Sequence, residues 1–166
     1  MLTRPETSID HEAIRAVTID AFGRPDEADL VDRLRRDGVV LLSLVAERGD
    51  AIAGHILFTR LPIHTATAVV DAVALAPLSV RSDVQRQGIG SALIKDGVNR
   101  LLDAGERIVI VVGDPRYYQR FGFSRRLTRN LSCPLSGPNF MAMELRAGAL
   151  DDLVGEVKYP DAFAIQ

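Results

Sequence analysis

The sequence predicts an α+β domain built around a mixed β-sheet. Three observations carry this prediction: two amphipathic helical segments come first, long apolar segments typical of strands follow, and a strand–helix–strand unit comes next. The chain has 166 residues, the size of one compact domain, and we expect residues 1–166 to form a single domain. With 47% hydrophobic and 25% charged residues, it has enough apolar material to bury a core.

The two helices are expected at the start of the chain. Residues 11–21 and 26–37 have apolar positions at the three- and four-residue spacing that is typical of a helix. Asp10 is a candidate N-cap for the first helix, and Gly38 ends the second.

Strands are expected next. Residues 39–46 are almost wholly apolar, a turn signal follows at 48–50, and 51–59 resume an extended pattern, which together predict an antiparallel hairpin. A third strand is expected over about 67–80. Because Pro77 lies inside it and cannot donate a backbone hydrogen bond, we expect a bulge or a break there.

A strand–helix–strand unit then follows. The loop 81–90 leads into a helix with an apolar stripe, and 108–112 form an apolar run typical of a buried strand. A strand–helix–strand unit of this length requires a right-handed crossover, with its two strands roughly parallel. Beyond it we expect a short helix over 116–121 and weaker extended segments near Phe123 and 140–145.

Composition limits the classes of partner. The formal net charge of −2 favours neither nucleic acid nor an anionic membrane. A lone Cys133 cannot form an internal disulfide, and no segment approaches the roughly 20 apolar residues of a membrane span. We therefore expect a cytoplasmic protein. Three scattered histidines and one cysteine show no metal-ligand spacing, so we expect no metal.

The most informative segment is Gln85-Arg86-Gln87-Gly88-Ile89-Gly90, between a strand and the start of a helix. Its two glycines let backbone N–H groups turn toward one point, where the helix dipole favours negative charge. Such a loop suits a pyrophosphate, and a plain tight turn is the alternative. Two common nucleotide-binding motifs are excluded. A Walker loop would need Gly-Lys-Ser/Thr, which is absent here, and a Rossmann fingerprint would need a third glycine at the position of Leu93.

This loop resembles the Gln/Arg-x-x-Gly-x-Gly/Ala signature of the GNAT superfamily of N-acetyltransferases. Leu78-Ser79-Val80 resembles the irregular strand end that precedes the signature in that family. Residues 113–123, which include Tyr118 and Gly122-Phe123, resemble the family's downstream Tyr-x-x-x-Gly-Phe element. The resemblance covers essentially the whole chain and is closest to a bacterial YhbS-type branch, including residues 155–160.

The resemblance implies a GNAT-like sheet, mixed and mostly antiparallel, which splays at the acyl-CoA site and has helices on its flanks. It implies acetyl-CoA as cosubstrate, with the pyrophosphate at the loop amides and the pantetheine arm beside the strand end as an added strand. Relatives often carry proline where this chain has Ser82, so we expect a slightly less rigid loop. The implied binding residues are Leu78, Val80, Gln85, Arg86, Gln87, Gly88, Ile89, Gly90 and Ser91.

The resemblance also implies a catalytic residue. Tyr118, four residues before Gly122, occupies the position where the family places a tyrosine beside the thioester sulfur. It would act as the general acid that protonates the leaving thiolate. The alternative is an aromatic core cluster, which we assign to Tyr117 and Phe121.

The general base stays open. Some relatives carry a glutamate where this chain has Ala74, so Asp71, Glu27 and His55, or a water chain, are the alternatives, and Asp26 lies beside Glu27.

The resulting expectation is an N-acetyltransferase in which a primary amine attacks acetyl-CoA directly in a ternary complex. A non-catalytic acyl-CoA sensor or interaction module with the same fold is the alternative. The acceptor, a small-molecule or peptide amine, is not identified by the sequence, nor is a preference for another acyl-CoA. The chain could also form a homodimer.

Overall fold

The computed structural model describes residues 1–163. The chain divides into two compact units, each described here by itself. Unit 1 comprises residues 1–59 and 76–99, and unit 2 comprises residues 60–75 and those after 99. The chain passes between the units within strand β3 (Ala51–His64), strand β4 (Val69–Val80) and helix α3 (Ile89–Asp103). The single-domain assignment of residues 1–166 stays a prediction.

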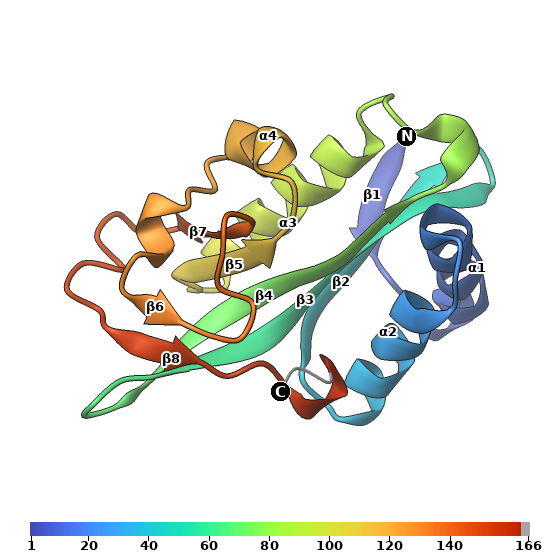
Figure 1. The fold of residues 1–166 in the computed structure, drawn as a ribbon. Coiled ribbons are helices and arrows are strands. Elements are labelled where there is room, and N and C mark those ends of the chain that lie inside the picture. Colours follow the sequence, from blue (N-terminus) through green and yellow to red (C-terminus); the bar gives the residue numbers. More distant parts are fainter. Residues whose placement is uncertain (164–166) are drawn as a thin grey trace. The chain divides into compact units, whose positions relative to one another are not determined.

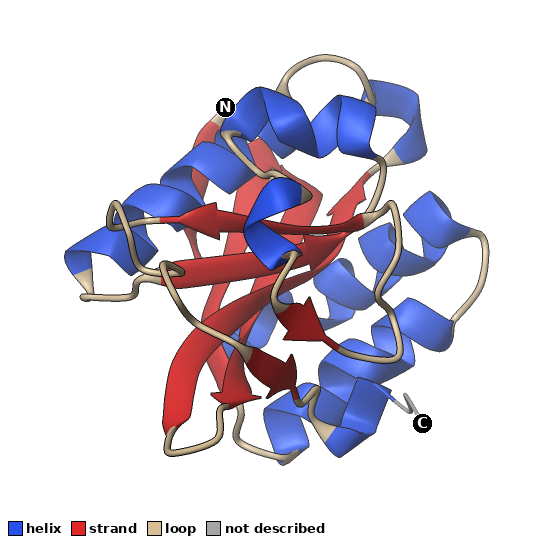
Figure 2. Ribbon diagram, turned by 60° about the vertical axis from the view of Figure 1, so that its left-hand side comes forward, coloured by secondary structure: helices blue, strands red, loops and turns tan. Residues whose placement is uncertain are grey.

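Unit 1 is a sheet with helices on both faces. It contains strand β1 (Leu2–Pro5), helices α1 (His11–Phe22) and α2 (Asp26–Arg36), and strand β2 (Val40–Arg48). Strand β1 pairs antiparallel with β2, and β2 pairs antiparallel with β3, so the predicted hairpin is confirmed. Helices α1 and α2 lie side by side on one face of these strands (Figures 1 and 2).

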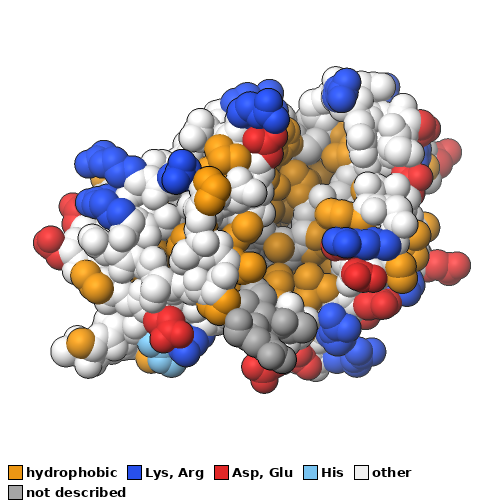
Figure 3. Space-filling view, in the orientation of Figure 1, with side chains coloured by type: hydrophobic (Ala, Val, Ile, Leu, Met, Phe, Trp, Pro, Cys, Tyr) orange, Lys and Arg blue, Asp and Glu red, His pale blue; other side chains and the backbone are white. Residues whose placement is uncertain are grey.

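The outer side of α1 and α2 carries charged side chains of both signs (Figure 3). Arg15 of α1 lies 2.8 Å from Asp29 and 3.0 Å from Asp32 of α2. Exposed ion pairs of this kind contribute little to stability, so this side is a solvated surface.

Helix α3 packs very closely against β3 at two glycines. An added β-carbon on Gly54 would lie 2.9 Å from Ile89 and 3.0 Å from Leu93, both side chains of α3. On the helix side, a β-carbon on Gly97 would overlap the ring of Phe58, which is fully buried. Only glycine allows backbone and side chain to approach so closely. These two contacts fix the position of α3 along β3, and with it the position of the helix N-terminus.

Unit 2 contains the remaining ends of β3 and β4 with four further strands. These are β5 (Ile108–Val112), β6 (Leu131–Ser132), β7 (Phe140–Glu144) and β8 (Gly155–Val157), and the short helix α4 (Pro115–Tyr118) follows β5. Strand β4 pairs in parallel with β5, which confirms the predicted strand–helix–strand unit. Strand β7 runs antiparallel to β5, and β8 pairs antiparallel with β3 and parallel with β6.

The core of unit 2 is apolar and mostly aliphatic, and it lies around these strands. Its buried members come from every strand of the unit and from the segment between β7 and β8; they include Leu61, Ile63, Ala72, Ile108, Ile110, Phe140, Leu150 and Val157. Burial of this apolar surface is the main favourable contribution to the folding of unit 2.

The predicted α+β fold with a mixed sheet is confirmed, and residues 1–163 contribute eight strands to it. Three short strands, β1, β6 and β8, were not predicted. Strand β3 extends past 59 to His64. We expected a bulge or a break at Pro77; β4 runs from Val69 to Val80, so the break is wrong, and the bulge stays a prediction. Proline removes only one donor from the ladder, and the residues on both sides keep the extended backbone. The Ala76–Pro77 bond is cis.

Asp10 precedes α1 as expected, but its carboxylate does not cap the first turn of that helix. It accepts hydrogen bonds from the Thr7 N–H at 2.7 Å and from the Arg4 guanidinium at 2.8 and 3.0 Å. Within residues 1–163, no helix is long and apolar enough to cross a membrane.

Because α3 and β3 are in close contact at Gly97, we expect the addition of a single methyl group there to destabilise the protein. Gly97→Ala should reduce the free energy of unfolding by about 1–3 kcal/mol in a urea titration, although alanine favours helix, because its methyl group overlaps Phe58. In a Phe58→Leu background the same change should cost clearly less. Equal costs in both backgrounds would show that the glycine does not accommodate that ring.

Candidate functional site

The loop between β4 and α3 turns sharply just before the helix. Arg86 and Gly88, on either side of Gln87, both have left-handed backbone conformations, with φ of 62° and 85°. The left-handed region is available to glycine without cost, whereas it is strained for Arg86. A β-carbon on Gly88 would meet no atom within 4 Å, so the space beside it is open. The loop therefore keeps its backbone accessible at this point.

The first turn of α3 supplies the polar groups. The Gly88 carbonyl accepts the Ala92 N–H at 3.0 Å, so the helical ladder starts there, and the amides of Ile89, Gly90 and Ser91 precede it. These N–H groups have no partners within the helix, and they lie at the positive end of a 15-residue helix dipole. Ile89 is buried, so it can offer only its backbone. The arrangement favours an anion.

Arginine side chains lie beside the loop. Arg48, at the end of β2, donates a hydrogen bond to the side-chain oxygen of Gln87, and Arg86 is exposed. Arg81 lies 2.6 Å from Asp83, and this hydrogen bond lowers the pKa of the Asp83 carboxyl. Arg48 was not predicted, because it is 39 residues from Gln87 in the chain and only the hairpin brings it near.

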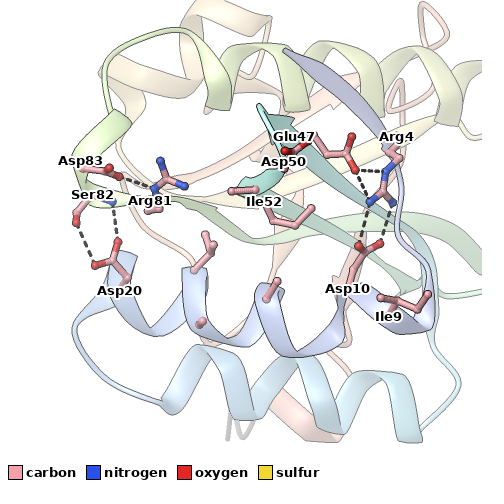
Figure 4. Close-up of a pocket in the computed structure, with 14 residues that line it drawn as sticks. Arg4, Ile9, Asp10, Asp20, Glu47, Asp50, Ile52, Arg81, Ser82 and Asp83 are labelled. Atoms are coloured by element: carbon pink, nitrogen blue, oxygen red, sulfur yellow. Dashed lines mark hydrogen bonds and ion pairs between the residues drawn. The ribbon is translucent and has the colours of Figure 1, made fainter.

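Ser82 is anchored to helix α1. Its backbone N–H donates to Asp20 at 2.7 Å, and its hydroxyl donates to the other oxygen of the same carboxylate at 3.0 Å (Figure 4). Two hydrogen bonds to a charged acceptor fix the start of the loop. This contact restricts the backbone at Ser82, where the sequence predicted a slightly less rigid loop.

The predicted strand-end residues have their backbone groups on the edge of β4 that faces away from β3. The Arg81 N–H donates to the Ala53 carbonyl of β3 at 2.8 Å. Backbone groups of successive strand residues point to opposite edges, so those of Val80 and Leu78 point away from β3. The Val80 carbonyl accepts the side-chain amide of Gln85 at 3.0 Å, which uses one of its two acceptor sites.

Tyr118 lies in unit 2, at the end of α4. Its ring packs over Gly113, where an added β-carbon would lie 2.9 Å from Cδ2 of the ring. It makes edge-to-face contacts with Tyr117 and Phe123, with centroids 5.0 and 5.8 Å apart. Burial, followed by the proximity of Tyr117, raises the pKa of Tyr118 to about 12. The phenol therefore keeps its proton at neutral pH and can donate it.

Tyr117 also contacts Phe121, so the expected aromatic cluster is present and includes Tyr118, but Tyr117 and Phe121 are only half-buried and do not belong to the core. Their centroids are 5.3 Å apart, and the Arg120 guanidinium lies 4.8 Å from the Tyr117 centroid. These contacts support a packing role for Tyr117.

The candidate bases differ in their surroundings. His55 is fully buried, with Nε2 2.8 Å from the Ser43 hydroxyl, and burial lowers its pKa to about 3. The Glu27 carboxylate is held by Arg24, which lowers its pKa, whereas Asp71 is exposed on β4. A buried neutral imidazole is a weak proton acceptor, so the geometry disfavours His55. Among residues 1–163, no group of three or more His, Cys, Asp or Glu side chains could hold a metal ion.

Comparison with known proteins identifies close relatives. The family model for the acetyltransferase (GNAT) domain matches residues 3–126. The chain is 33% identical to the uncharacterized N-acetyltransferase YhbS of Escherichia coli K12, over 98% of each protein. The crystal structure of E. coli YhbS with CoA covers 98% of this chain, and the chain covers 91% of that structure, with a TM-score of 0.88 and 32% identity.

A second solved relative comes from Brucella melitensis. This GNAT family acetyltransferase, in complex with acetyl-CoA, matches 98% of this chain and 97% of its own, with a TM-score of 0.82 and 34% identity.

Because of the Asp20–Ser82 contact, we expect the effect of Ser82→Pro on the free energy of unfolding to depend on the residue at position 20. Ser82→Pro in the wild-type background removes both donors to Asp20 and should lower the free energy of unfolding by about 1 kcal/mol. In an Asp20→Asn background the same change should be neutral or stabilising, because Ser82 opens a short helical turn and Arg81, with ψ of 133°, suits a following proline. Urea unfolding measures both. Equal effects of Ser82→Pro in the two backgrounds would contradict the anchor.

Proposed function

The chain belongs to the GNAT family of acetyltransferases, and from this premise we propose that it transfers the acetyl group of acetyl-CoA to a primary amine by direct attack in a ternary complex. The observation that carries the proposal is the open loop with left-handed Arg86 and Gly88, which ends at the N-terminus of a 15-residue helix. The solved relatives from E. coli and B. melitensis, bound to CoA and acetyl-CoA, support the same choice of cosubstrate.

In this proposal the loop holds the pyrophosphate. The amides from Gln85 to Ser91 donate to its oxygens, and the open space beside Gly88 admits it. Arg86 adds a cation from within the loop, and Arg48, through its contact with Gln87, adds another beside it. The negative charge of the pyrophosphate is thus balanced by backbone dipoles and exposed arginines. These groups must be local to the loop, because the chain as a whole has a formal net charge of −2.

The pantetheine arm would lie along the free edge of β4. The Leu78 and Val80 backbone groups that point away from β3 would pair with the amides of the arm as with an added strand. Because the Val80 carbonyl already accepts from Gln85, the arm would use its second acceptor site or displace that side chain.

Tyr118 is proposed as the general acid. When the amine nitrogen bonds to the acetyl carbon, the carbon–sulfur bond breaks and the electron pair stays on sulfur. Tyr118 donates its phenolic proton to that thiolate. Its role rests on the Tyr-x-x-x-Gly-Phe spacing. The phenol is protonated at neutral pH, as a general acid must be, although burial, which raises its pKa to about 12, also makes it a weaker acid.

No side chain is proposed as the general base. His55 is buried and Glu27 is held by Arg24, so loss of the amine proton to water, or to Asp71, fits the surroundings of these residues better. The acceptor is proposed only as a class, a small-molecule or peptide amine, because the described residues do not single out one compound.

Cosubstrate binding is tested by a charge placed at the third position of α3. Ser91→Glu should stabilise the helix by about 0.3–1 kcal/mol, because an anion favours the helix N-terminus, yet it should weaken CoA binding about 10-fold or more in isothermal titration calorimetry. Ser91→Gln has nearly the same shape without the charge and should change CoA affinity little. Unchanged affinity in Ser91→Glu would place the pyrophosphate elsewhere.

Catalysis is tested by removing one hydroxyl. Tyr118→Phe should leave acetyl-CoA affinity nearly unchanged, while the rate of thiol release with a working amine falls about 10–10³-fold. Because the pKa of Tyr118 is raised to about 12, the ratio of the two rates should stay constant from about pH 6 to about pH 10.

Tyr117→Phe, the matched control, should keep both affinity and rate. Wild-type turnover in Tyr118→Phe would remove the catalytic role. Tight acetyl-CoA binding by the wild-type protein without turnover on any amine would favour the sensor function.

A further inference from the structure

A groove of about 730 Å³ runs along helix α1 in unit 1; we call it the α1 groove. Its lining includes Ala13 and Ala16 of α1, and Ala51 and Ile52 at the start of β3. Figure 4 shows Ile52 with the charged residues of the lining. Ala16 is exposed and Ile52 is half-buried, so apolar surface in the groove is uncovered. The volume lies within the roughly 300–1,000 Å³ of small-molecule sites.

Carboxylates dominate the charged groups of the α1 groove. Five carboxylates and two guanidinium groups line it, a formal excess of three negative charges. At one end, Asp10 and Glu47 share the single guanidinium of Arg4, at 2.8 and 2.7 Å. The hydrogen bond from Arg4 lowers the pKa of Asp10 to about 2, so this carboxyl stays charged at neutral pH. The groove therefore favours the binding of a positively charged ligand.

The other end has the same imbalance. Asp20 accepts from Ser82, and Asp83 pairs with Arg81, so again one guanidinium stands against two carboxylates. Asp50 also lines the groove. Figure 4 shows the apolar Ile52 between the end at Asp20 and the end at Asp10.

This spacing argues against a metal ion as the occupant. Asp10 and Asp20 lie about 15 Å apart along the axis of α1, at 1.5 Å per residue, so one small ion cannot bind carboxylates at both ends. The described residues also contain no cluster of three or more metal-ligating side chains. Separated carboxylates with an apolar wall between them match a cation that carries a hydrocarbon body.

We propose that the α1 groove is a binding site for a small organic ammonium ion. Its apolar body covers Ala16 and Ile52, and its ammonium group faces the carboxylates on the lining, which include Asp50. The site is distinct from the proposed pyrophosphate site, because none of the residues from Gln85 to Ser91 lines the groove. It does not depend on catalysis.

The test uses the full chain, without acetyl-CoA, and hexylammonium chloride as the probe in isothermal titration calorimetry. Hexylammonium should bind, and hexanoate, which has the same body with the opposite charge, should bind at least about 10-fold more weakly. Excess CoA should not displace the ammonium. Equal binding of the two probes, or displacement by CoA, would overturn the proposal.

Two variants locate the ligand. Ala16→Leu fills the groove with a residue that favours helix and should weaken hexylammonium binding at least about 10-fold, whereas Ala16→Ser leaves the groove open and should keep the affinity. Asp50→Asn removes one charge and should weaken binding about 2–5-fold at low salt, and less at high salt. Unfolding curves identify any variant that fails to fold. Wild-type affinity in a folded Ala16→Leu protein would overturn the assignment to this groove.

Discussion

The close approach of helix α3 to strand β3 is the constraint on which the proposed cosubstrate site depends. At Gly54 and Gly97 the two elements meet at distances that leave no room for a β-carbon. Two contacts along one helix fix both its height above the strand and its position along it. The first turn of α3 is therefore held by packed elements, and its amides point in one direction without help from a ligand. Binding groups carried by rigid elements lose little entropy when a ligand arrives.

The loop before α3 combines this fixed helix with local strain. Arg86 adopts a left-handed conformation that costs free energy for a residue with a side chain, and such a conformation persists only where its surroundings hold it. Several contacts do so: Asp20 binds Ser82, Gln85 binds the Val80 carbonyl, and Arg48 binds Gln87. At the start of the loop, an acidic residue on α1 restricts the backbone through hydrogen bonds to Ser82.

The sequence alone predicted much of this structure because its long elements carry strong local signals. Apolar periodicity identified α1, α2 and α3, and the run 108–112 identified β5. The parallel pairing of β5 with β4 was predicted because a helix connects the two strands. No local sequence pattern predicts strands β1, β6 and β8. They have two to four residues each, and they are extended because they pair with strands that are distant in the sequence. The glycine loop was predicted because glycines before a helix let backbone N–H groups turn toward one point, where an anion can bind.

The side chains that support the glycine loop were not predicted from the sequence, because Asp20 and Arg48 reach the loop only through tertiary structure.

The proposed pyrophosphate site is tested most directly by amide chemical-shift mapping of the ¹⁵N-labelled protein during titration with CoA and, separately, with pantetheine. We expect CoA to shift the amide resonances of Gly88, Ile89, Gly90 and Ser91 most strongly. Pantetheine, which lacks the pyrophosphate, should leave the resonances of these four amides unshifted. If saturation with CoA also left them unshifted, the pyrophosphate would not bind at this loop.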